Sequence, residues 1–232
     1  MKLGIIGAME VEVETLLEQM ENRTVLEKAG SVFYEGILAG IPAVVVRCGV
    51  GKVNAALCVQ ILCDCFAVSH IVNTGIAGSL NAELDIGDLV VSRDAMYHDF
   101  DCCAVGYVKG TVPGMPTVFH ADETLISLAF SAAEQVNPGH TRVGRVASGD
   151  LFVCAPQAKA DIIATTGGIC TEMEGAGIAQ TAYRNGVPFV ILRAISDKAD
   201  DSAEMDYPTF EKLAAHRCAA VVVALVERLK NL

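Results

Sequence analysis

The chain has 232 residues, of which 52% are hydrophobic and 19% are charged, and its formal net charge is -11 at pH 7. This length and composition predict one α/β domain, spanning residues 1–232, with a sizeable buried core. The acidic balance and the absence of any lysine or arginine run argue against binding to nucleic acid or to an anionic membrane, because both need basic patches.

The cysteines and the N-terminal run indicate a reduced, cytoplasmic protein. The nine cysteines have no spacing typical of a disulfide framework, and several lie within apolar segments. Cys63-x-Cys65 and the Cys102-Cys103 pair lack the spacing of a tetrahedral zinc site, so we expect neither a metal nor a cofactor. The N-terminal run is too short for a signal peptide, and no stretch reaches membrane-spanning length without a charge or a glycine.

The first part of the chain alternates between strand and helix patterns. The hydrophobic pattern predicts strands over residues 2–7, 32–40, 43–48 and 70–79, and helices over about 10–20 and 53–66. Gly40 indicates a hairpin, with a turn at Ile41 and Pro42. The strands that end at Gly7, Gly49 and Gly75 open into tight turns, and their carboxyl ends should form one ligand-facing rim.

The second part continues the alternation after one irregular segment. A further strand is predicted from Leu84 to about Asp101, and residues 102–120 have no clear period, which is typical of a functional or interface loop. The remaining pattern predicts helices over about 121–136, 157–164, 172–183 and 207–229, and strands over 142–150 and 187–195. Pro208 is expected in the first turn of the last helix. Together these elements predict a central mixed, twisted β-sheet flanked by helices.

Two polar clusters bracket the predicted helix and strand between residues 172 and 197. Glu172 and Glu174 stand where the helix should start, and Arg193, Ser196 and Asp197 stand at the end of the strand. In an open α/β sheet, ligands bind outside the carboxyl ends of the strands, which is where the second cluster falls. We therefore expect Asp197 and Glu174 to be functional carboxylates.

Glu12, near the start of the first helix, is a third candidate. Helical spacing sets it on a different face from Glu10 and Glu14, which we expect to solvate the helix. Carboxylates near strand ends suit general acid–base chemistry in which one carboxyl group lies on each side of the bond that breaks. The residues alone therefore indicate a small neutral or cationic ligand and an acid–base cleavage or transfer.

Other patterns of active sites are missing or weak. The loop Gly49-Val-Gly-Lys52 resembles a phosphate loop but lacks the longer glycine spacing and the Ser or Thr after the lysine. The sequence contains no Ser/His/Asp set with a nucleophile elbow and no GxGxxG fingerprint.

Several motifs occur in an order and spacing that resemble one known family. They are Gly4-Ile-Ile-Gly-Ala-Met-Glu-x-Glu12, Cys48-Gly-Val-Gly-Lys-Val, Asn73-Thr-Gly-x-Ala-Gly78, Gly87-Asp-Leu-Val-Val-Ser, Ser148-Gly-Asp150, Glu172-Met-Glu174 and Arg193-Ala-Ile-Ser-Asp197. Over essentially the whole chain, this pattern resembles the bacterial methylthioadenosine/S-adenosylhomocysteine nucleosidases of the nucleoside phosphorylase superfamily. The resemblance implies a nucleoside phosphorylase-like fold and hydrolysis of the N-ribosidic bond, with release of adenine, in methionine salvage.

The resemblance also implies roles for individual residues. Asp197 matches the general acid that protonates N7 of adenine, Glu12 matches the base that deprotonates the attacking water, and Glu174 matches the carboxylate at the ribose hydroxyls. The other residues that the resemblance brings to the substrate or the water are Gly78, Phe152 stacked on adenine, Val153 at the base edge, Glu172, Met173 beneath the sugar, Arg193 and Ser196.

The resemblance further implies a pocket for the alkylthio group that two subunits share. Its residues in one subunit would be Met9, Val50 and Tyr207, and those from the neighbouring subunit of a homodimer would be Cys102, Val105 and Pro113. This arrangement would account for the irregular segment at 102–120.

Two departures from the family pattern keep alternatives open. Ile76 stands where many relatives carry a hydroxyl residue, so a water contact there would fall to the backbone. Arg47 stands before the glycine loop, and a purine nucleoside phosphorylase, which binds phosphate through arginines, is the alternative enzyme. Glu12 argues against it because a carboxylate repels the phosphate dianion.

A non-catalytic nucleoside-binding module is the second alternative. The sequence leaves open the preferred nucleoside among methylthioadenosine, S-adenosylhomocysteine, 5′-deoxyadenosine and aminodeoxyfutalosine.

Overall fold

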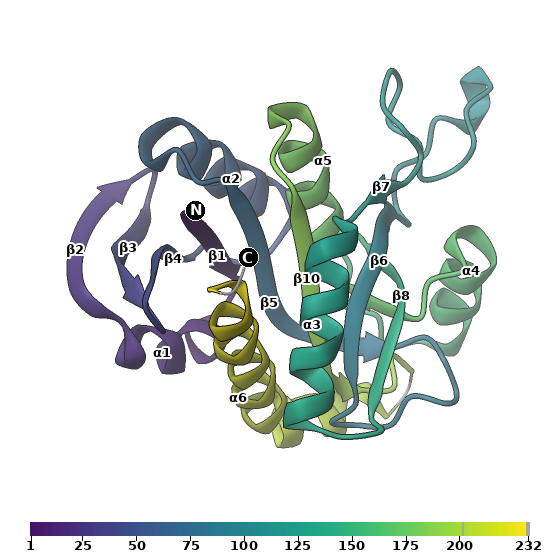
Figure 1. The fold of residues 1–232 in the computed structure, drawn as a ribbon. Coiled ribbons are helices and arrows are strands. Elements are labelled where there is room, and N and C mark those ends of the chain that lie inside the picture. The colour runs from purple at the N-terminus through teal and green to yellow at the C-terminus, as the bar shows by residue number, and fades with distance from the viewer. Residues whose placement is uncertain (201, 231–232) are drawn as a thin grey trace.

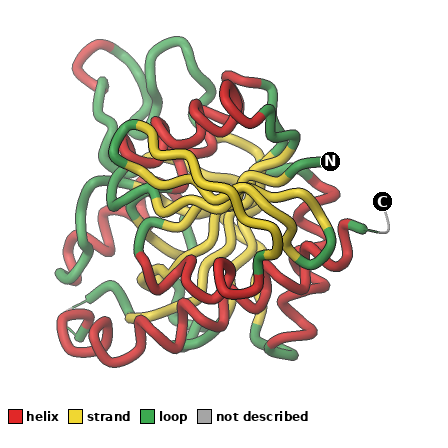
Figure 2. The backbone as a smooth tube through the Cα atoms, turned by 90° about the vertical axis from the view of Figure 1, so that its left-hand side faces the viewer, coloured by secondary structure: helices red, strands yellow, loops and turns green. Residues whose placement is uncertain are grey.

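A 10-stranded mixed β-sheet forms the centre of the structure, with helices around it (Figure 1, Figure 2). The computed structural model describes residues 1–200 and 202–230. The strands are β1 (Leu3–Gly7), β2 (Glu21–Lys28), β3 (Ser31–Leu38), β4 (Ile41–Arg47), β5 (His70–Ser79), β6 (Leu89–Tyr97), β7 (Phe119–His120), β8 (Thr141–Ser148), β9 (Cys170–Glu172) and β10 (Phe189–Asp197). The helices are α1 (Glu10–Gln19), α2 (Lys52–Phe66), the 3-10 turn η1 (Cys103–Val105), α3 (Glu123–Val136), α4 (Pro156–Thr166), α5 (Gly175–Asn185) and α6 (Ala203–Leu229). The predicted α/β class is confirmed.

Strand β5 connects two parts of the sheet. Its first residues pair in parallel with β1, nearly its whole length pairs in parallel with β10, and its last residues, Gly78 and Ser79, pair with β9. Because β10 also pairs with β6, the strands β10, β6, β8, β9 and β5 close into a ring, from which β1, β4, β3 and β2 extend. The carboxyl ends of β5 and β10 therefore meet at one place. Strand β5 has the predicted range of 70–79, so the tight turn that we expected at Gly75 lies within a continuous strand.

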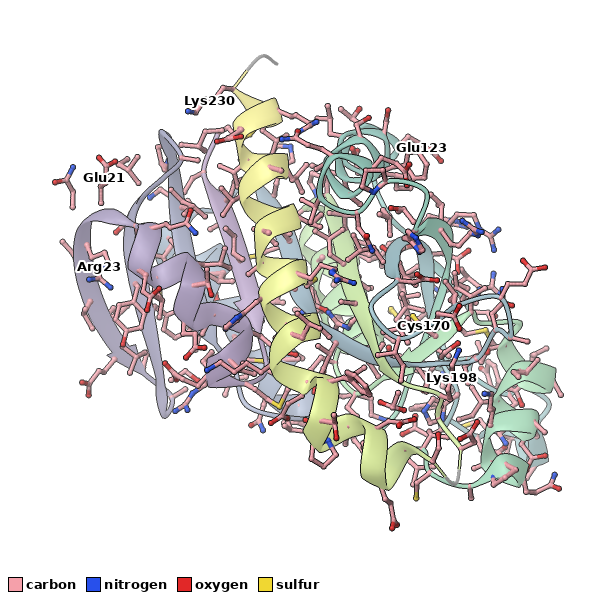
Figure 3. The ribbon with its side chains drawn as sticks, turned by 90° about the horizontal axis from the view of Figure 1, so that it is seen from below. Glu21, Arg23, Glu123, Cys170, Lys198 and Lys230 are labelled. Carbon is pink, nitrogen blue, oxygen red and sulfur yellow. The ribbon has the colours of Figure 1, made fainter. Side chains whose placement is uncertain are left out.

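Helix α6 runs along one side of the sheet. Figure 3 shows its length, with Arg23 of β2 on one side of it and Cys170 of β9 on the other. It contacts β10, β5, α1 and α3, and inward side chains such as Val222 and Leu225 are fully buried. Burying one such side chain contributes about 1.5–3 kcal/mol. This packing holds the start of α6, which carries Tyr207, near the strand ends. No helix within residues 1–200 and 202–230 is long and apolar enough to cross a membrane.

The hairpin between β3 and β4 is confirmed, but its turn lies two residues earlier than predicted. Ala39 and Gly40 have φ of 45° and 84°, which is the left-handed region that a tight hairpin turn requires. Ile41 and Pro42 already belong to β4 and pair with β3.

The strand predicted from Leu84 begins only at Leu89. Residues between them form a turn, in which the Asp88 N–H donates to the Asp85 carbonyl at 3.0 Å and the Asp85 N–H donates to the Asp88 carboxylate at 2.8 Å. Aspartate favours such turns because its side chain bonds to nearby backbone groups.

The helix predicted at 172–183 begins three residues later, at Gly175. Glu172 ends strand β9, and Glu174 is the residue just before the helix. The cause is local, because the Glu172 carboxylate accepts hydrogen bonds from the N–H groups of Glu174 and Gly175 and so holds the chain at the start of the helix.

The C-terminal helix begins earlier than its proline suggested. Helix α6 starts at Ala203, so Pro208 lies inside the helix and not in its first turn. Glu204 and Asp206 are acidic residues near the new start, which is the favourable sign at the positive end of a helix dipole. These acids were the better signal of where the helix begins.

Candidate active site

A cavity of about 340 Å³ lies at the place where the carboxyl ends of β5 and β10 meet. It is lined by Ala8, Met9, Glu12, Val50, Ile76, Ala77, Gly78, Leu151, Phe152, Val153, Thr171, Glu172, Met173, Glu174, Ser196, Asp197 and Tyr207. Residues from both ends of the chain therefore share one cavity, as the sequence predicted for Glu12 and Asp197.

Glu12 is held at the base of the cavity by backbone amides. One carboxylate oxygen accepts from the N–H groups of Ala8 at 2.6 Å and Met9 at 3.0 Å, and the other accepts from Ile76 at 3.1 Å. Burial raises the pKa of Glu12, and Arg193 together with these amides offsets only part of that effect. A Cβ at Gly75 would lie 2.6 Å from a Glu12 oxygen, so only glycine leaves room for this carboxylate.

Arg193 lies behind the cavity and is 1% exposed. Its guanidinium forms an ion pair with Glu172 and donates to the Asn73 side-chain oxygen at 2.5 Å and to the Leu192 carbonyl at 2.9 Å. Burial alone would lower its pKa, but the surrounding carboxylates, Glu172 first, raise it and keep the group charged. The arginine is therefore a fixed positive charge beneath the cavity rather than part of its wall.

Both carboxylate oxygens of Glu172 accept hydrogen bonds from other groups of the protein. One oxygen accepts from the Ser148 hydroxyl, and the other accepts from Arg193 and from the N–H groups of Glu174 at 3.0 Å and Gly175 at 2.8 Å. Burial alone would raise the pKa of Glu172, but Arg193 and these donors outweigh it and lower the pKa. Glu172 is thus a buried carboxylate that stays ionised.

Glu174 reaches into the same space but has few partners. Its carboxylate accepts from the Gly51 N–H at 2.9 Å and lies 4.0 Å from the nearest Arg193 nitrogen. Burial, and then the negative charge of Glu172, raise its pKa to about 8. The pKa values of these two glutamates are therefore shifted in opposite directions, because Glu172 meets the arginine at shorter range and has more hydrogen-bond donors.

An irregularity in β10 sets the orientation of the Asp197 side chain. The register between β10 and β5 shifts between Ile195 and Asp197, which pairs with Gly78, and such bulges re-aim side chains. The carboxylate accepts from the Ala199 N–H at 2.8 Å and from the Ser196 hydroxyl at 2.8 Å. Burial raises its pKa despite these two donors.

Apolar and aromatic side chains form the rest of the cavity wall. The rings of Phe152 and Tyr207 meet edge to face with centroids 5.4 Å apart, and the Tyr207 hydroxyl donates to the Met9 sulfur at 3.2 Å. Phe152 and Val50 remain 44% and 50% exposed, so both can contact a ligand. This end of the cavity suits a flat ring and an apolar substituent.

Arg193, Cys102, Val105 and Pro113 are the predicted site residues that do not line this cavity. Cys102, Val105 and Pro113 belong to the connection between β6 and β7, which projects away from the rest of the molecule (Figure 1). Val105 is 72% exposed there. The structure therefore does not bring these three residues to the cavity of their own chain.

The two departures noted in the sequence have simple structural explanations. Ile76 contributes its backbone N–H, which donates to Glu12, so no hydroxyl side chain is needed to hold that carboxylate. Arg47 forms an exposed ion pair with Glu10, with 3.3 Å between the atoms, and does not line the cavity.

Some contributors to the site had no role in the sequence interpretation. Asn73 and Ser148 bond to Arg193 and Glu172, and the Gly51 N–H bonds to Glu174. All three belong to motifs named in the sequence analysis, but sequence spacing alone does not show which side chains they contact. Among residues 1–200 and 202–230, no group of three or more His, Cys, Asp and Glu side chains has an arrangement that could hold a metal ion.

Comparisons with known proteins agree on one group of relatives. Residues 2–227 match the model of the phosphorylase superfamily. A 5′-methylthioadenosine/S-adenosylhomocysteine nucleosidase from Exiguobacterium sp. (strain ATCC BAA-1283 / AT1b) is 41% identical over 232 residues, covering 100% of both chains. The Neisseria meningitidis 5′-methylthioadenosine/S-adenosylhomocysteine nucleosidase in complex with methylthio-immucillin-A is 39% identical, with a TM-score of 0.95 over 98% of this chain and 99% of that chain. Futalosine hydrolase of Helicobacter pylori strain 26695 is 31% identical, with a TM-score of 0.94 over 98% of this chain and 97% of that chain.

Replacement of Arg193 should reveal how much the fold depends on this buried charge. We expect Arg193→Met to lower the free energy of unfolding by about 3–5 kcal/mol, because Glu172 would be left as an unpaired buried charge. Urea denaturation measures the change. Arg47→Met, which removes an exposed ion pair, is the matched control and should change stability by about 1 kcal/mol or less. Equal effects of the two substitutions would contradict the assigned role of the buried pair.

Proposed function

Because the chain belongs to the phosphorylase superfamily, and within it to the 5′-methylthioadenosine/S-adenosylhomocysteine nucleosidases, we propose that it hydrolyses the N-ribosidic bond of these two nucleosides. Adenine and the 5-thioribose product are released, a step of methionine salvage, and 5′-deoxyadenosine reacts by the same route. The observation that carries this proposal is the cavity itself, in which Glu12 and Asp197 are buried carboxylates with raised pKa values.

The charges around the cavity favour water over phosphate as the nucleophile. Within the described residues, no lysine or arginine lines the cavity. Arg193 is already paired with Glu172, and Arg47 faces Glu10 at the surface. A phosphate dianion would enter a cavity lined by carboxyl groups without a compensating cation, which is strongly unfavourable in a buried site.

Asp197 supplies the proton that makes adenine a neutral leaving group. The bond between C1′ and N9 breaks with its electron pair going to the base, while a proton from Asp197 passes to N7. Burial supports this role because it favours the protonated carboxyl. Ser196 and the Ala199 N–H fix the direction of the side chain. Phe152 stacks on the adenine ring, and the backbone of Val153 meets its edge.

Glu12 and Glu174 act on the other side of the breaking bond. The oxygen of a water molecule bonds to C1′, and Glu12 accepts a proton of that water. Its raised pKa makes Glu12 a better proton acceptor than an exposed glutamate. Glu174 holds the ribose hydroxyls above Met173 and opposes the positive charge that develops on the sugar. The protons then re-equilibrate with solvent, so the net reaction consumes one water.

The alkylthio group occupies the apolar end of the cavity beside Met9, Val50 and Tyr207. A homodimer completes this end, with Cys102, Val105 and Pro113 entering from the partner. The projecting β6–β7 connection and its exposed valines, Val105 and Val108 at 72% and 69%, support this assembly (Figure 1). A cytoplasmic location is supported by the nine cysteines, all of which are unpaired thiols.

The absence of a phosphate requirement is the first expected result. Adenine release from 5′-methylthioadenosine, followed by chromatography in phosphate-free buffer, should proceed at full rate, and added phosphate should leave the rate unchanged. Release that depends strictly on phosphate would replace hydrolysis with phosphorolysis.

Asp197→Asn should remove the general acid while leaving the shape of the cavity intact. We expect kcat to fall by ~10²–10⁴-fold, the usual contribution of one positioned acid, while the Kd for adenine changes little. Asp85→Asn is the matched control, because the Asp85 side chain is 84% exposed and pairs with Lys198 at the surface. A kcat near that of the unmodified enzyme would refute the assigned role of Asp197.

Val105→Glu should weaken the dimer and the alkylthio pocket together. A charged side chain at a buried apolar contact is unfavourable, so we expect sedimentation to show monomers and the KM for 5′-methylthioadenosine to rise about tenfold or more. Val25→Glu, at an exposed valine of β2, is the control. A monomer with unchanged KM would remove the β6–β7 connection from the site.

A further inference from the structure

Glu172 faces the cavity, yet every contact of its carboxylate serves the protein. It holds the Arg193 guanidinium, the Ser148 hydroxyl and the first N–H groups of α5, those of Glu174 and Gly175. Ser148 in turn accepts from the Ala176 N–H at 2.7 Å, so strands β8, β9 and β10 and helix α5 are joined through this one carboxylate. Four donors of the protein thus already occupy this carboxylate, three of them at one oxygen and the Ser148 hydroxyl at the other.

Two carboxylates lie near Arg193, and the arginine pairs with Glu172 rather than with Glu174. The same guanidinium nitrogen contacts Glu172 and lies 4.0 Å from Glu174. Glu174 instead accepts from the Gly51 N–H at 2.9 Å and points into the cavity. The short contact to Glu172 therefore keeps the arginine from drawing Glu174 out of the cavity.

We propose that Glu172 is a positioning residue rather than a substrate ligand, and that by holding Arg193 and the start of α5 it leaves Glu174 free to bind the ribose hydroxyls. The proposal rests on the proposed hydrolysis for the identity of the ligand. It reassigns Glu172 from the substrate-binding set and gives this buried ion pair a function besides stability.

The charges around Glu174 agree with this arrangement. The titratable and charged groups that face Glu174 or share its cavity are Glu172 of β9, Arg193 of β10, Glu12 of α1, Cys48 after β4, Asp197 of β10 and Tyr207 of α6. Those around Glu172 are Arg193, Glu174, Tyr97, His98 and Cys170. Burial and the negative charge of Glu172 raise the pKa of Glu174 to about 8, and Arg193 lowers it only in part.

Removal of the charge of Glu172 should lower the pKa of Glu174. Glu172→Gln removes the nearest negative charge and releases Arg193, whose nitrogen is already 4.0 Å from Glu174. Both changes favour the ionised form of Glu174, so its pKa falls. Since Glu174 acts as a carboxylate, activity rises with pH through that pKa, and the acidic limb of the kcat/KM profile reports it in the free enzyme. The limb should therefore move to lower pH.

The experiment compares kcat/KM for adenine release from 5′-methylthioadenosine against pH in the full chain. For Glu172→Gln we expect the acidic limb to move down by about one pH unit or more, as for a carboxylate that gains a cation within about 4–6 Å. KM should rise at the same time, because Glu174 turns toward Arg193. An unmoved limb in folded Glu172→Gln overturns the proposal.

Asp94→Asn separates this effect from a general loss of stability. It breaks another buried carboxylate–arginine pair, Asp94 with Arg145 at 2.5 Å, which joins β6 to β8 away from the cavity. We expect it to lower the unfolding midpoint in urea without moving the limb. A limb that moves equally in both variants contradicts the specific role of Glu172.

Glu172→Asp provides a test even where the neutral variant does not fold. It keeps the negative charge beside Arg193, so the limb should stay near its position in the unmodified enzyme, while a downward shift of about one unit would overturn the proposal. Failure of the proposed function looks different, because the unmodified protein would then release no adenine at any pH.

Discussion

A buried arginine that must keep a counterion organises this protein. Arg193 is among the largest fully buried side chains, and its charge is balanced by Glu172 at the point where β9, β10 and α5 meet. A buried guanidinium without such a partner is strongly unfavourable, so the closure of the strand ring and the place of the cavity depend on the same contact. Asn73 and the Leu192 carbonyl satisfy further donors of the group.

The carboxyl groups around this charge have pKa values that are shifted in different directions. Glu172 contacts the guanidinium and has a lowered pKa, whereas burial raises the pKa values of Glu12, Glu174 and Asp197. Burial thus raises the pKa values of both proposed catalytic groups, Glu12 and Asp197, while the arginine lowers only that of Glu172. The backbone amides at Glu12 and the bulge at Asp197 then aim the two groups.

Much of this arrangement could be predicted from the sequence, and the remainder depends on tertiary contacts. Buried strands and the hairpin follow from local apolar patterns, and Glu12 and Asp197 were identified from their places beside strand ends. Glu172 was grouped with Glu174 because sequence spacing cannot tell which glutamate meets an arginine that is 21 positions away. The β6–β7 connection has no periodic pattern, since residues 103–108 are exposed and do not pack against their own chain, with Val105 at 72%.

The origin of the oxygen that joins the sugar tests the account most directly. Turnover of 5′-methylthioadenosine in ¹⁸O-labelled water, with mass spectrometry of both products, should place one labelled oxygen on C1 of the thioribose and none on adenine. Label that is present at C1 at the earliest times, before the anomeric hydroxyl of the free sugar exchanges with solvent, comes from attack by water. A sugar product that carries phosphate, or no labelled oxygen at C1 during turnover, would contradict it.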